Sequence, residues 1–321
     1  PAGDITVNGL SYTIKAQDNR YNTTISGPHS LSINFASGEL TSNRSGSGLS
    51  GGVNMDSWRI ISVPGQLDEN DPKEVLKDEV GKRTVERWEL WHWLNDKWEF
   101  PGGIEPGKGY WFIQWVSPSV SIDPGPGYSV DLTGFTYNLT PGWNIIGNPY
   151  TFTAALDLDE SKFYGPISYN QGWSSPNTQL QPWGGYAVYN KGGGTETVSL
   201  NMSASAQNLS REQVNTPDGW KLNIGAYGKN YIDKGNSLGR ISGSLEGLDF
   251  RDNPEPPYMG GYVSVVMPKK DNSENIYNFT SDIRSLAETD GVWDIQLRIK
   301  GETGPVTLNF DIEGDFPVEH D

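Results

Sequence analysis

The 321-residue sequence has no cysteine, few histidines and no apolar run long enough to cross a membrane. Without cysteine the chain has no disulfide, no thiolate metal ligand and no cysteine nucleophile. Its three histidines, His29, His92 and His320, lie far apart and form no H-E-x-x-H motif, so no zinc site is predicted.

Positive charge is also scarce, since 24 Lys and Arg stand against 40 Asp and Glu and give a formal net charge of -16. An acidic surface repels phosphate backbones, so nucleic acid is not an expected partner. Residues 1–53 differ from the rest because they hold three acids and three bases. The whole excess of acid therefore lies in residues 54–321.

Extended helical periodicity is absent, while glycine (39) and proline (21) are abundant. This combination favours an all-β chain with many turns. One short helix is expected, because Asp71-Pro72 offers an N-cap and a first-turn proline, Val75, Leu76 and Val80 form an apolar stripe, and Gly81 can end it.

An internal duplication organises the middle of the chain. Trp58–Pro64 and Trp143–Pro149 share the pattern W-x-I-I-x-x-P, and each is followed by P-x-x-G-Y, at Pro106–Tyr110 and Pro182–Tyr186. Between these landmarks each copy has aromatic residues around a turn, at Asn95-Asp96 and at Asn170–Gly172. Landmarks in the same order predict two copies of one β unit.

The predicted architecture is all-β in three parts. Residues 1–53 form a small N-terminal β segment with a Gly/Ser linker, and 54–206 form the duplicated Trp-rich unit, with copies at about 54–117 and 128–200. Residues 118–127 are rich in Pro and Gly and predict a stiff connector between the copies. Residues 207–321 form a C-terminal antiparallel β-sandwich. Its predicted strands begin at Trp220, Tyr262, Trp293 and Val306.

These motifs carry a resemblance to a known group of proteins. The order W-R-I-I-S-V-P, P-G-K-G-Y, G-W-N-I-I-G-N-P-Y and P-W-G-G-Y resembles the tandem β modules near the C-termini of large secreted proteins that Gram-negative bacteria export by the type IX route. Residues from 219 onward resemble the domain that normally precedes the sorting signal there, through G-W-K-L-N-I-G-A, Gly247–Asp249, Asn253–Pro257, Ser281–Arg284 and Val292–Asp294. The resemblance implies an exported protein whose sorting domain is removed, so that a mature chain can end at Asp321.

Enzyme signals are weak. Two G-x-S-x-G matches occur, around Ser50 and Ser237, but a nucleophile elbow needs a strand before the serine, a helix after it and a histidine in reach, and no helix is predicted after either. A glycosidase needs two carboxylates across an aromatic cleft, and nothing in the sequence singles out a pair among 40 acids. We therefore expect no enzymatic activity.

Two binding sites are predicted. Oxygen-bearing residues in Gly- and Pro-rich loops suit calcium, with turn-forming side chains as the alternative. The calcium candidates are Asp233, Asn236, Asp249, Asp252 and Glu255. Ten of the twelve tryptophans lie between Trp58 and Trp183, and their rings either fill the core or stack on sugars. Core positions are expected for Trp58, Trp111, Trp143 and Trp293, and sugar platforms at the turns for Trp93, Trp98 and Trp173.

The sequence thus predicts a non-enzymatic secreted or cell-surface module for attachment or surface assembly, as the tail of a larger exported protein. The alternative is a carbohydrate-binding module that serves an enzyme, with a polysaccharide as partner. Residues 1–35 carry little charge and several β-prone pairs. Because an unprotected edge strand can pair with another chain, self-association or docking on a surface protein is expected to use this segment.

Overall fold

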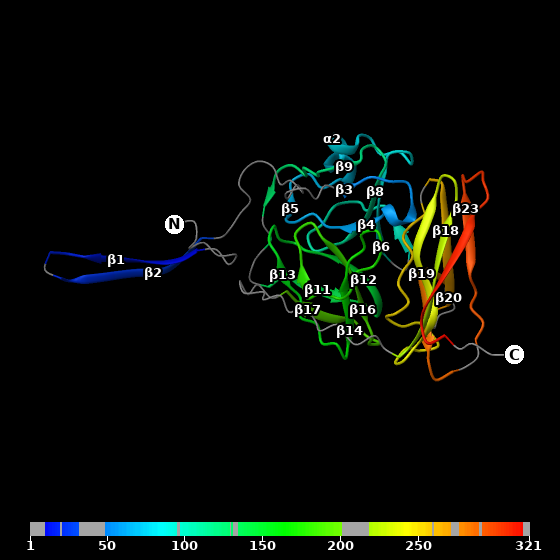
Figure 1. The fold of residues 1–321 in the computed structure, drawn as a ribbon. Helices are drawn as coiled ribbons and strands as arrows, with labels where there is room; N and C mark the ends of the chain where they lie inside the picture. The colour runs from blue at the N-terminus through cyan, green and yellow to red at the C-terminus, as the bar shows by residue number, and fades with distance from the viewer. Residues whose placement is uncertain are drawn as a thin grey trace.

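The computed structural model describes residues 10–19, 21–31, 49–94, 97–128, 130, 134–200, 218–258, 260–270, 276–288 and 291–316. The fold is all-β, as predicted (Figure 1). Three parts follow one another along the chain: an N-terminal hairpin, a duplicated unit and a C-terminal sandwich. No helix in the described ranges has the length and apolar character needed to cross a membrane.

The N-terminal hairpin consists of β1 (Leu10–Gln17) and β2 (Thr23–Leu31). The two strands pair antiparallel with a shift of register between Tyr12 and Ile14. Figure 1 shows the hairpin projecting from the body of the molecule as a separate ribbon. Its described side chains from residue 13 to residue 28 are exposed, so it packs on no other described part of the chain.

Copy one is built around a four-stranded antiparallel sheet in the order β4-β8-β6-β7. These strands are β4 (Arg59–Ile61), β6 (Trp88–Leu94), β7 (Lys97–Glu99) and β8 (Tyr110–Gln114). Two short pairs flank the sheet, β3 (Leu49–Ser50) with β9 (Ser119–Val120) and β5 (Gln66–Leu67) with β10 (Gly127–Tyr128). A 3-10 turn, η2 (Met55–Ser57), leads into β4.

Copy two repeats the plan with a sheet in the order β12-β16-β14. These strands are β12 (Gly142–Gly147), β14 (Phe163–Ile167) and β16 (Gly185–Asn190). The flanking pairs are β11 (Thr136–Leu139) with β17 (Glu196–Ser199), and β13 (Ala154–Ala155) with β15 (Gln179–Leu180). β4 and β12, which carry the two I-I motifs, therefore occupy equivalent positions, each beside the strand that begins at or next to the tyrosine of P-x-x-G-Y.

Reciprocal hydrogen bonds join the two copies. The backbone N–H of Ser62 in copy one donates to the oxygen of Trp183 in copy two at 3.0 Å, and the N–H of Gly147 in copy two donates to the oxygen of Gly107 in copy one at 2.8 Å. Each donor lies four residues after the motif tryptophan, and each acceptor follows the motif proline. The copies are therefore related by an approximate two-fold axis.

The glycine before each motif tyrosine is explained by this contact. A Cβ at Gly109 would collide with the backbone of Ile146 in copy two, and a Cβ at Gly185 would collide with Ile60 and the backbone of Ile61 in copy one. The motif tyrosines also share a role, because each hydroxyl accepts a bond from the backbone N–H five residues earlier, at 2.8 Å for Tyr110 and 2.6 Å for Tyr186. P-x-x-G-Y thus lets the strand of the other copy approach closely.

Three hydrophobic clusters fill the duplicated unit. Each copy has a core of its own, around Leu90 and Phe112 in copy one and around Leu156 and Val188 in copy two. The third cluster lies between the copies and is mainly aromatic. Trp58 and Trp111 are almost fully buried there, which confirms their predicted core positions, whereas Trp143 is partly buried.

The predicted helix is present but broken. It forms two single turns, α1 (Pro72–Val75) and α2 (Lys77–Val80), that meet at Leu76. The Asp71 carboxylate accepts a bond from the N–H of Lys73 at 2.9 Å and caps the first turn. Gly81 ends the second turn with a φ of 71°, a value that favours glycine.

The C-terminal part is a two-sheet sandwich. One sheet has the order β22-β19-β18-β24 and the other β21-β20-β23. Their strands are β18 (Gly219–Tyr227), β19 (Ile232–Ile241), β20 (Tyr262–Lys270), β21 (Ile276–Phe279), β22 (Ser281–Ser285), β23 (Gln296–Lys300) and β24 (Thr307–Gly314). All pairs are antiparallel except β19 with β22, which is parallel. The predicted antiparallel sandwich therefore contains one parallel pair of strands, at the edge of one sheet.

The structure moves two predicted boundaries. β3 pairs with β9, so copy one begins at Leu49, before residue 54. The Pro- and Gly-rich stretch 118–127 is not a free connector, because β9 and the start of β10 lie within it and Ile122 is almost fully buried. The turn at Asn95-Asp96 and the boundary near Gln207 lie outside the described residues.

Candidate functional site

A cleft of about 1530 Å³ lies between the duplicated unit and the sandwich. Both units contribute aromatic rings to its walls. The duplicated unit supplies Trp93, Trp98, Trp143 and Tyr189, and the sandwich supplies Phe250, Tyr258, Tyr277 and Phe279. All but Phe279 are partly exposed. The cleft therefore presents aromatic surface from two units to one ligand.

Two of the predicted sugar-platform tryptophans line this cleft. Trp93 on β6 and Trp98 on β7 face each other across the hairpin register, with ring centroids 4.8 Å apart and an interplanar angle of 70°. Trp93 also contacts Tyr277 of β21, with centroids 5.8 Å apart. The contact places an aromatic ring of each unit side by side in the cleft wall.

Trp143 connects the two units beneath the cleft. Its indole N–H donates to the backbone oxygen of Asp252 in the sandwich at 3.0 Å. Its ring stacks on Trp173 at 6.2 Å with an interplanar angle of 24°, and it meets Tyr189 edge-on at 5.2 Å. Because these contacts fix the ring from two sides, Trp143 is a rigid part of the cleft floor.

Trp173 is not a wall of the cleft. It lies in the cluster between the copies, against Trp111 at 5.6 Å and Tyr169 at 5.2 Å. Its indole N–H is buried and has no hydrogen-bond partner among the described residues. The structure thus supports packing, and not a sugar platform, for this residue.

Lysines and amides supply the polar part of the cleft. Lys97, Lys191 and Lys270 line it together with Asn190 and Asn278. Lys97 pairs with Glu99 at 2.6 Å, and Lys191 lies over the Phe250 ring at 4.8 Å from its centroid. The cleft rim therefore places lysine ammonium groups next to aromatic faces, whereas the Asn190 amide is buried and donates to the backbone oxygens of Leu139 and Gly194.

Two acids, Asp249 and Glu255, also line the cleft, and both are buried. The oxygens of Asp249 accept bonds from the backbone N–H groups of Leu245 and Arg251, each at 2.7 Å. Glu255 accepts a bond from the Ser264 hydroxyl at 2.7 Å. A glycosidase needs two carboxyl groups that reach the sugar. Asp249 and Glu255 are instead buried and hydrogen-bonded within the sandwich, so they do not form such a pair.

The five predicted calcium ligands do not form one site. Asp249 and Asp252 belong to a tight turn in which the N–H of Asp249 donates to Asp252 at 2.8 Å. The Lys269 ammonium lies between Asp252 and Asp282, at 3.0 and 2.9 Å. The Lys269 ammonium thus neutralises Asp252. Asp249 and Asp252 therefore stabilise the turn, which was the alternative to calcium binding.

Asp233, Asn236 and Glu255 form the second group, inside the sandwich. Asp233 accepts bonds from the Asn236 amide at 2.9 Å and from the N–H of Val265 at 2.7 Å. Burial raises the pKa of Asp233 to about 7, and burial and the neighbouring Asp233 charge raise the pKa of Glu255 well above its usual range. At neutral pH this pair therefore retains a proton.

Within the ranges that the structure describes, no three acidic or histidine side chains are arranged to hold a metal ion. The two G-x-S-x-G serines also lack the geometry of a nucleophile elbow. Ser50 lies in β3 and bonds Arg59 at 3.0 Å, and Ser237 lies within β19. Neither occupies a strand-to-helix turn.

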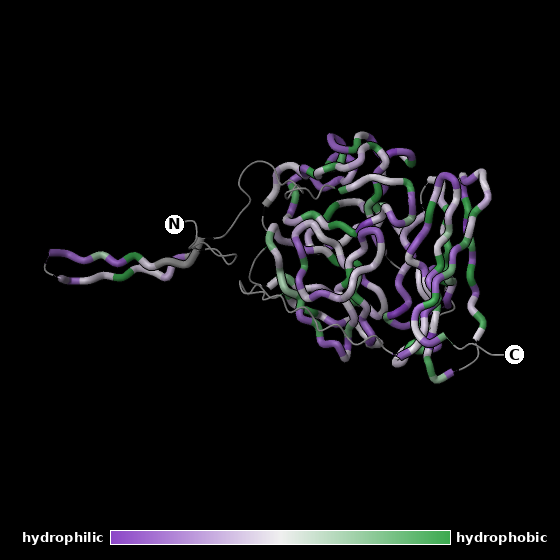
Figure 2. The backbone as a smooth tube through the Cα atoms, viewed as in Figure 1, coloured by the Kyte–Doolittle hydropathy of each residue, from purple (hydrophilic) through white to green (hydrophobic). Residues whose placement is uncertain are grey.

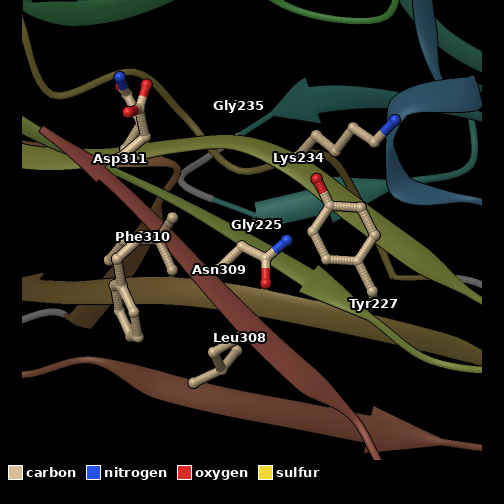
Figure 3. A pocket seen from close by; sticks show the side chains of 10 residues that line it. Gly225, Tyr227, Lys234, Gly235, Leu308, Asn309, Phe310 and Asp311 are labelled. Carbon is tan, nitrogen blue, oxygen red and sulfur yellow. The ribbon is translucent and has the colours of Figure 1, made fainter.

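A second, shallower hollow of about 610 Å³ lies over β18, β19 and β24 (Figure 3). Figure 3 shows Leu308 and Phe310 on one side of β24 and Asp311 on the other. Lys234 lies near the Tyr227 ring, 5.8 Å from its centroid. The hollow is open, and of the described residues only Tyr227 and Phe310 bring aromatic rings to its lining, so the aromatic cleft is the stronger candidate.

No protein-family model, curated protein or solved structure matches this chain. The site must therefore be interpreted from its own geometry. Sequence reasoning missed Phe250, Tyr258 and Tyr277, since each is an isolated aromatic residue in the sandwich. Only the approach of β21 to β6 and β7 brings Tyr277 to Trp93.

Proposed function

We propose that this protein is a non-enzymatic secreted or cell-surface module for attachment, and that it holds a polysaccharide chain in the aromatic cleft. The observation that carries the proposal is the paired lining of the cleft by Trp93 and Trp98 from one unit and Tyr277 from the other. Partly exposed rings offer flat apolar faces to sugar rings, and their polar edges remain available to hydroxyl groups.

The size of the cleft favours an extended ligand. Pockets for small molecules measure about 300–1,000 Å³, and this cleft exceeds that range at about 1530 Å³. Among its polar groups, the ammonium of Lys97, whose side chain is 65% exposed, can bond hydroxyl or acidic groups along a chain. A polysaccharide with several consecutive sugars in contact is the class of ligand that fits.

The place of action in the proposal is the cell surface or the extracellular space. It rests on the likeness of the W-x-I-I-x-x-P and P-x-x-G-Y motifs to modules of type IX-exported proteins. In such a setting the cleft would attach a larger protein to a glycan-bearing surface. The alternative, a carbohydrate-binding module accessory to an enzyme, uses the same cleft and differs only in what it is joined to.

Polysaccharide pull-down combined with affinity electrophoresis tests the proposal. We expect retention on a subset of neutral and acidic polysaccharides, with quenching of tryptophan fluorescence when a soluble fragment of the retained polymer is added. The same samples should show no release of reducing ends, because the two acids among the described residues that line the cleft, Asp249 and Glu255, are both buried. Absence of binding to every polymer in the panel contradicts the proposed ligand, and release of reducing ends contradicts the non-enzymatic assignment.

A further inference from the structure

The sandwich is open along the side formed by β23 and β24, which are the last strands of their respective sheets. In β23, Leu297 pairs with Val265 and Ile299 pairs with Val263. Paired residues in adjacent strands point to the same face of a sheet, and both valines lie in the buried core. Leu297 and Ile299 therefore point into the sandwich, yet they are 39% and 48% exposed.

The same mismatch occurs on β24. Phe310 pairs with Ile224 and Leu308 pairs with Ala226, and both partners are buried core residues. Phe310 is nevertheless 58% exposed. In a closed sandwich the inward residues of one sheet are covered by the other. Among the described residues nothing covers these side chains of β24, so this part of the sandwich has room for one more strand beside β24.

The backbone of β24 is also available at this place. Among the described strands β24 pairs with β18 alone, so its outer edge presents unpaired N–H and C=O groups. The opposite face of the strand is acidic, with Asp311 and Glu313 on it. A strand that fits this edge should have one apolar face and a basic residue on the other.

β1 in the N-terminal hairpin has this pattern. Leu10, Tyr12, Ile14 and Ala16 alternate with polar residues that include Lys15, and β1 and β24 are both eight residues long. Ile14 is 53% exposed, and an isolated two-stranded hairpin is at best marginally stable in water. Figure 2 shows hydrophobic segments in the projecting hairpin as well as along the strands of the sandwich.

We propose that β1 of one copy adds to the free edge of β24 in a second copy and closes its sandwich. The alternating face of β1 then covers Leu308, Phe310 and Ile312, and Lys15 lies on the same face as Asp311 and Glu313. Backbone hydrogen bonds provide affinity, and the apolar pockets fix the register. The hairpin and this edge lie at opposite ends of the molecule (Figure 1).

The strand that is donated, β1, and the edge that accepts it, on β24, are different surfaces of the protein. The contact is therefore heterologous, and a bound pair of copies still has one free β1 and one free β24 edge. The protein therefore assembles head to tail into open chains. This inference is independent of the proposed glycan cleft, because none of the residues that it uses lines that cleft.

Sedimentation velocity on the full chain over a range of concentrations tests the assembly. The wild-type chain should form concentration-dependent oligomers without a fixed end size. Ile14→Asp disrupts the donated strand β1, and Phe310→Asp disrupts the accepting edge of β24. Each should weaken self-association at least ten-fold. Ile25→Ser is the matched control, since Ile25 is also exposed but pairs with Lys15 on the opposite hairpin face. A neutral side chain there leaves the charge of Lys15 unchanged, so this variant should associate like the wild type.

Mixing the two inactive variants gives the sharpest result. Ile14→Asp retains its acceptor and Phe310→Asp retains its donor, so an equimolar mixture should form a heterodimer and stop there. A wild-type chain that stays monomeric at about 1 mM, equal loss in the Ile25→Ser control, or no heterodimer in the mixture overturns the proposal. Protection of β1 amides from hydrogen exchange in a monomer would also overturn it, because the hairpin would then dock within its own chain. Glycan binding by Ile14→Asp should be unchanged.

Discussion

The indole N–H of Trp143, in copy two, donates a hydrogen bond of 3.0 Å to the backbone oxygen of Asp252, in the sandwich. Trp143 is the second residue of the motif G-W-N-I-I-G, and Asp252 lies in the turn that Lys269 stabilises. The bond connects the landmark of the internal repeat to the C-terminal unit. It also fixes the spacing of the two walls of the cleft.

We expect Trp143→Phe to lower the free energy of unfolding by about 1–3 kcal/mol more than Trp173→Phe, because it leaves the Asp252 oxygen without its partner. Trp173 stacks on Trp143 and is a matched control, since its own N–H has no partner among the described residues. Urea unfolding of both variants measures the difference. Equal losses would show that ring volume, and not the bond, is what matters.

Trp93→Ala should weaken polysaccharide binding at least ten-fold, which is about 1.4 kcal/mol, because it removes the ring that touches Tyr277. Phe310→Ala is a suitable control, since it removes an exposed aromatic ring outside the cleft. Affinity electrophoresis on the retained polymer gives both values. Unchanged retention of Trp93→Ala would place the ligand elsewhere.

Stability should fall as pH rises from about 4 to about 7. In the folded state burial raises the pKa of Asp233 from its ordinary value of 3.8 to about 7, and burial and the neighbouring Asp233 charge raise the pKa of Glu255 well above its ordinary value of 4.5. The folded state therefore binds more protons than the unfolded state in this window, so its stabilisation is complete below the unfolded pKa and is lost as pH rises through the folded pKa. Burial raises the pKa of Asp252 to about 7 against the opposing effect of Lys269, which adds a loss in the same direction.

Thermal unfolding at pH 5 and pH 8 measures this effect. Glu255→Gln should reduce the difference between the two pH values, because it removes one member of the buried pair. Glu302→Gln is the control, since Glu302 is partly exposed and backbone hydrogen bonds lower its pKa, so it does not titrate between pH 5 and pH 8. A pH dependence that is identical in wild type and Glu255→Gln would contradict the role of the pair.

Gly109→Ala and Gly185→Ala should each destabilise the protein by more than about 2 kcal/mol, because a Cβ at either position meets the backbone of the other copy. Gly102→Ala is the control, since a Cβ there meets nothing within 4 Å. Chemical unfolding compares the three variants. Similar costs for Gly109 and Gly185 are expected from their equivalent positions, and a small cost at both would argue against the close contact.

The fold class and the duplication were predictable from sequence because they rest on local patterns. The motifs at Trp58 and Trp143 mark equivalent strands, and the Asp71 cap and Gly81 mark the ends of the short helical region. Such signals depend on backbone conformation and on neighbours in sequence. They do not show why Gly109 must be glycine, since the reason lies in Ile146 of the other copy.

The candidate site was only partly predictable. Trp93 and Trp98 share a hairpin, which sequence reasoning can recognise, but Trp173 has the same local context and lies among packed rings instead. The calcium prediction assumed that the carboxylate oxygens of Asp249 and Asp252 are available as metal ligands. Their hydrogen bonds to backbone N–H groups and to Lys269 come from turn geometry and from a distant strand. Composition and spacing do not contain that information.

The reciprocal bonds between the copies have a consequence for the order in which the chain can fold as it is synthesised. The backbone N–H of Ser62 has its partner at Trp183, and β4 meets residue 184 along its outer edge. Copy one can therefore pair β4 with its own β8 as it emerges, but the outer edge of β4 stays uncovered until nearly all of copy two has followed. A ribosome stalled between the copies would present this exposed edge to chaperones, whereas one stalled far enough beyond residue 200 for that residue to have left the exit tunnel would carry a finished unit.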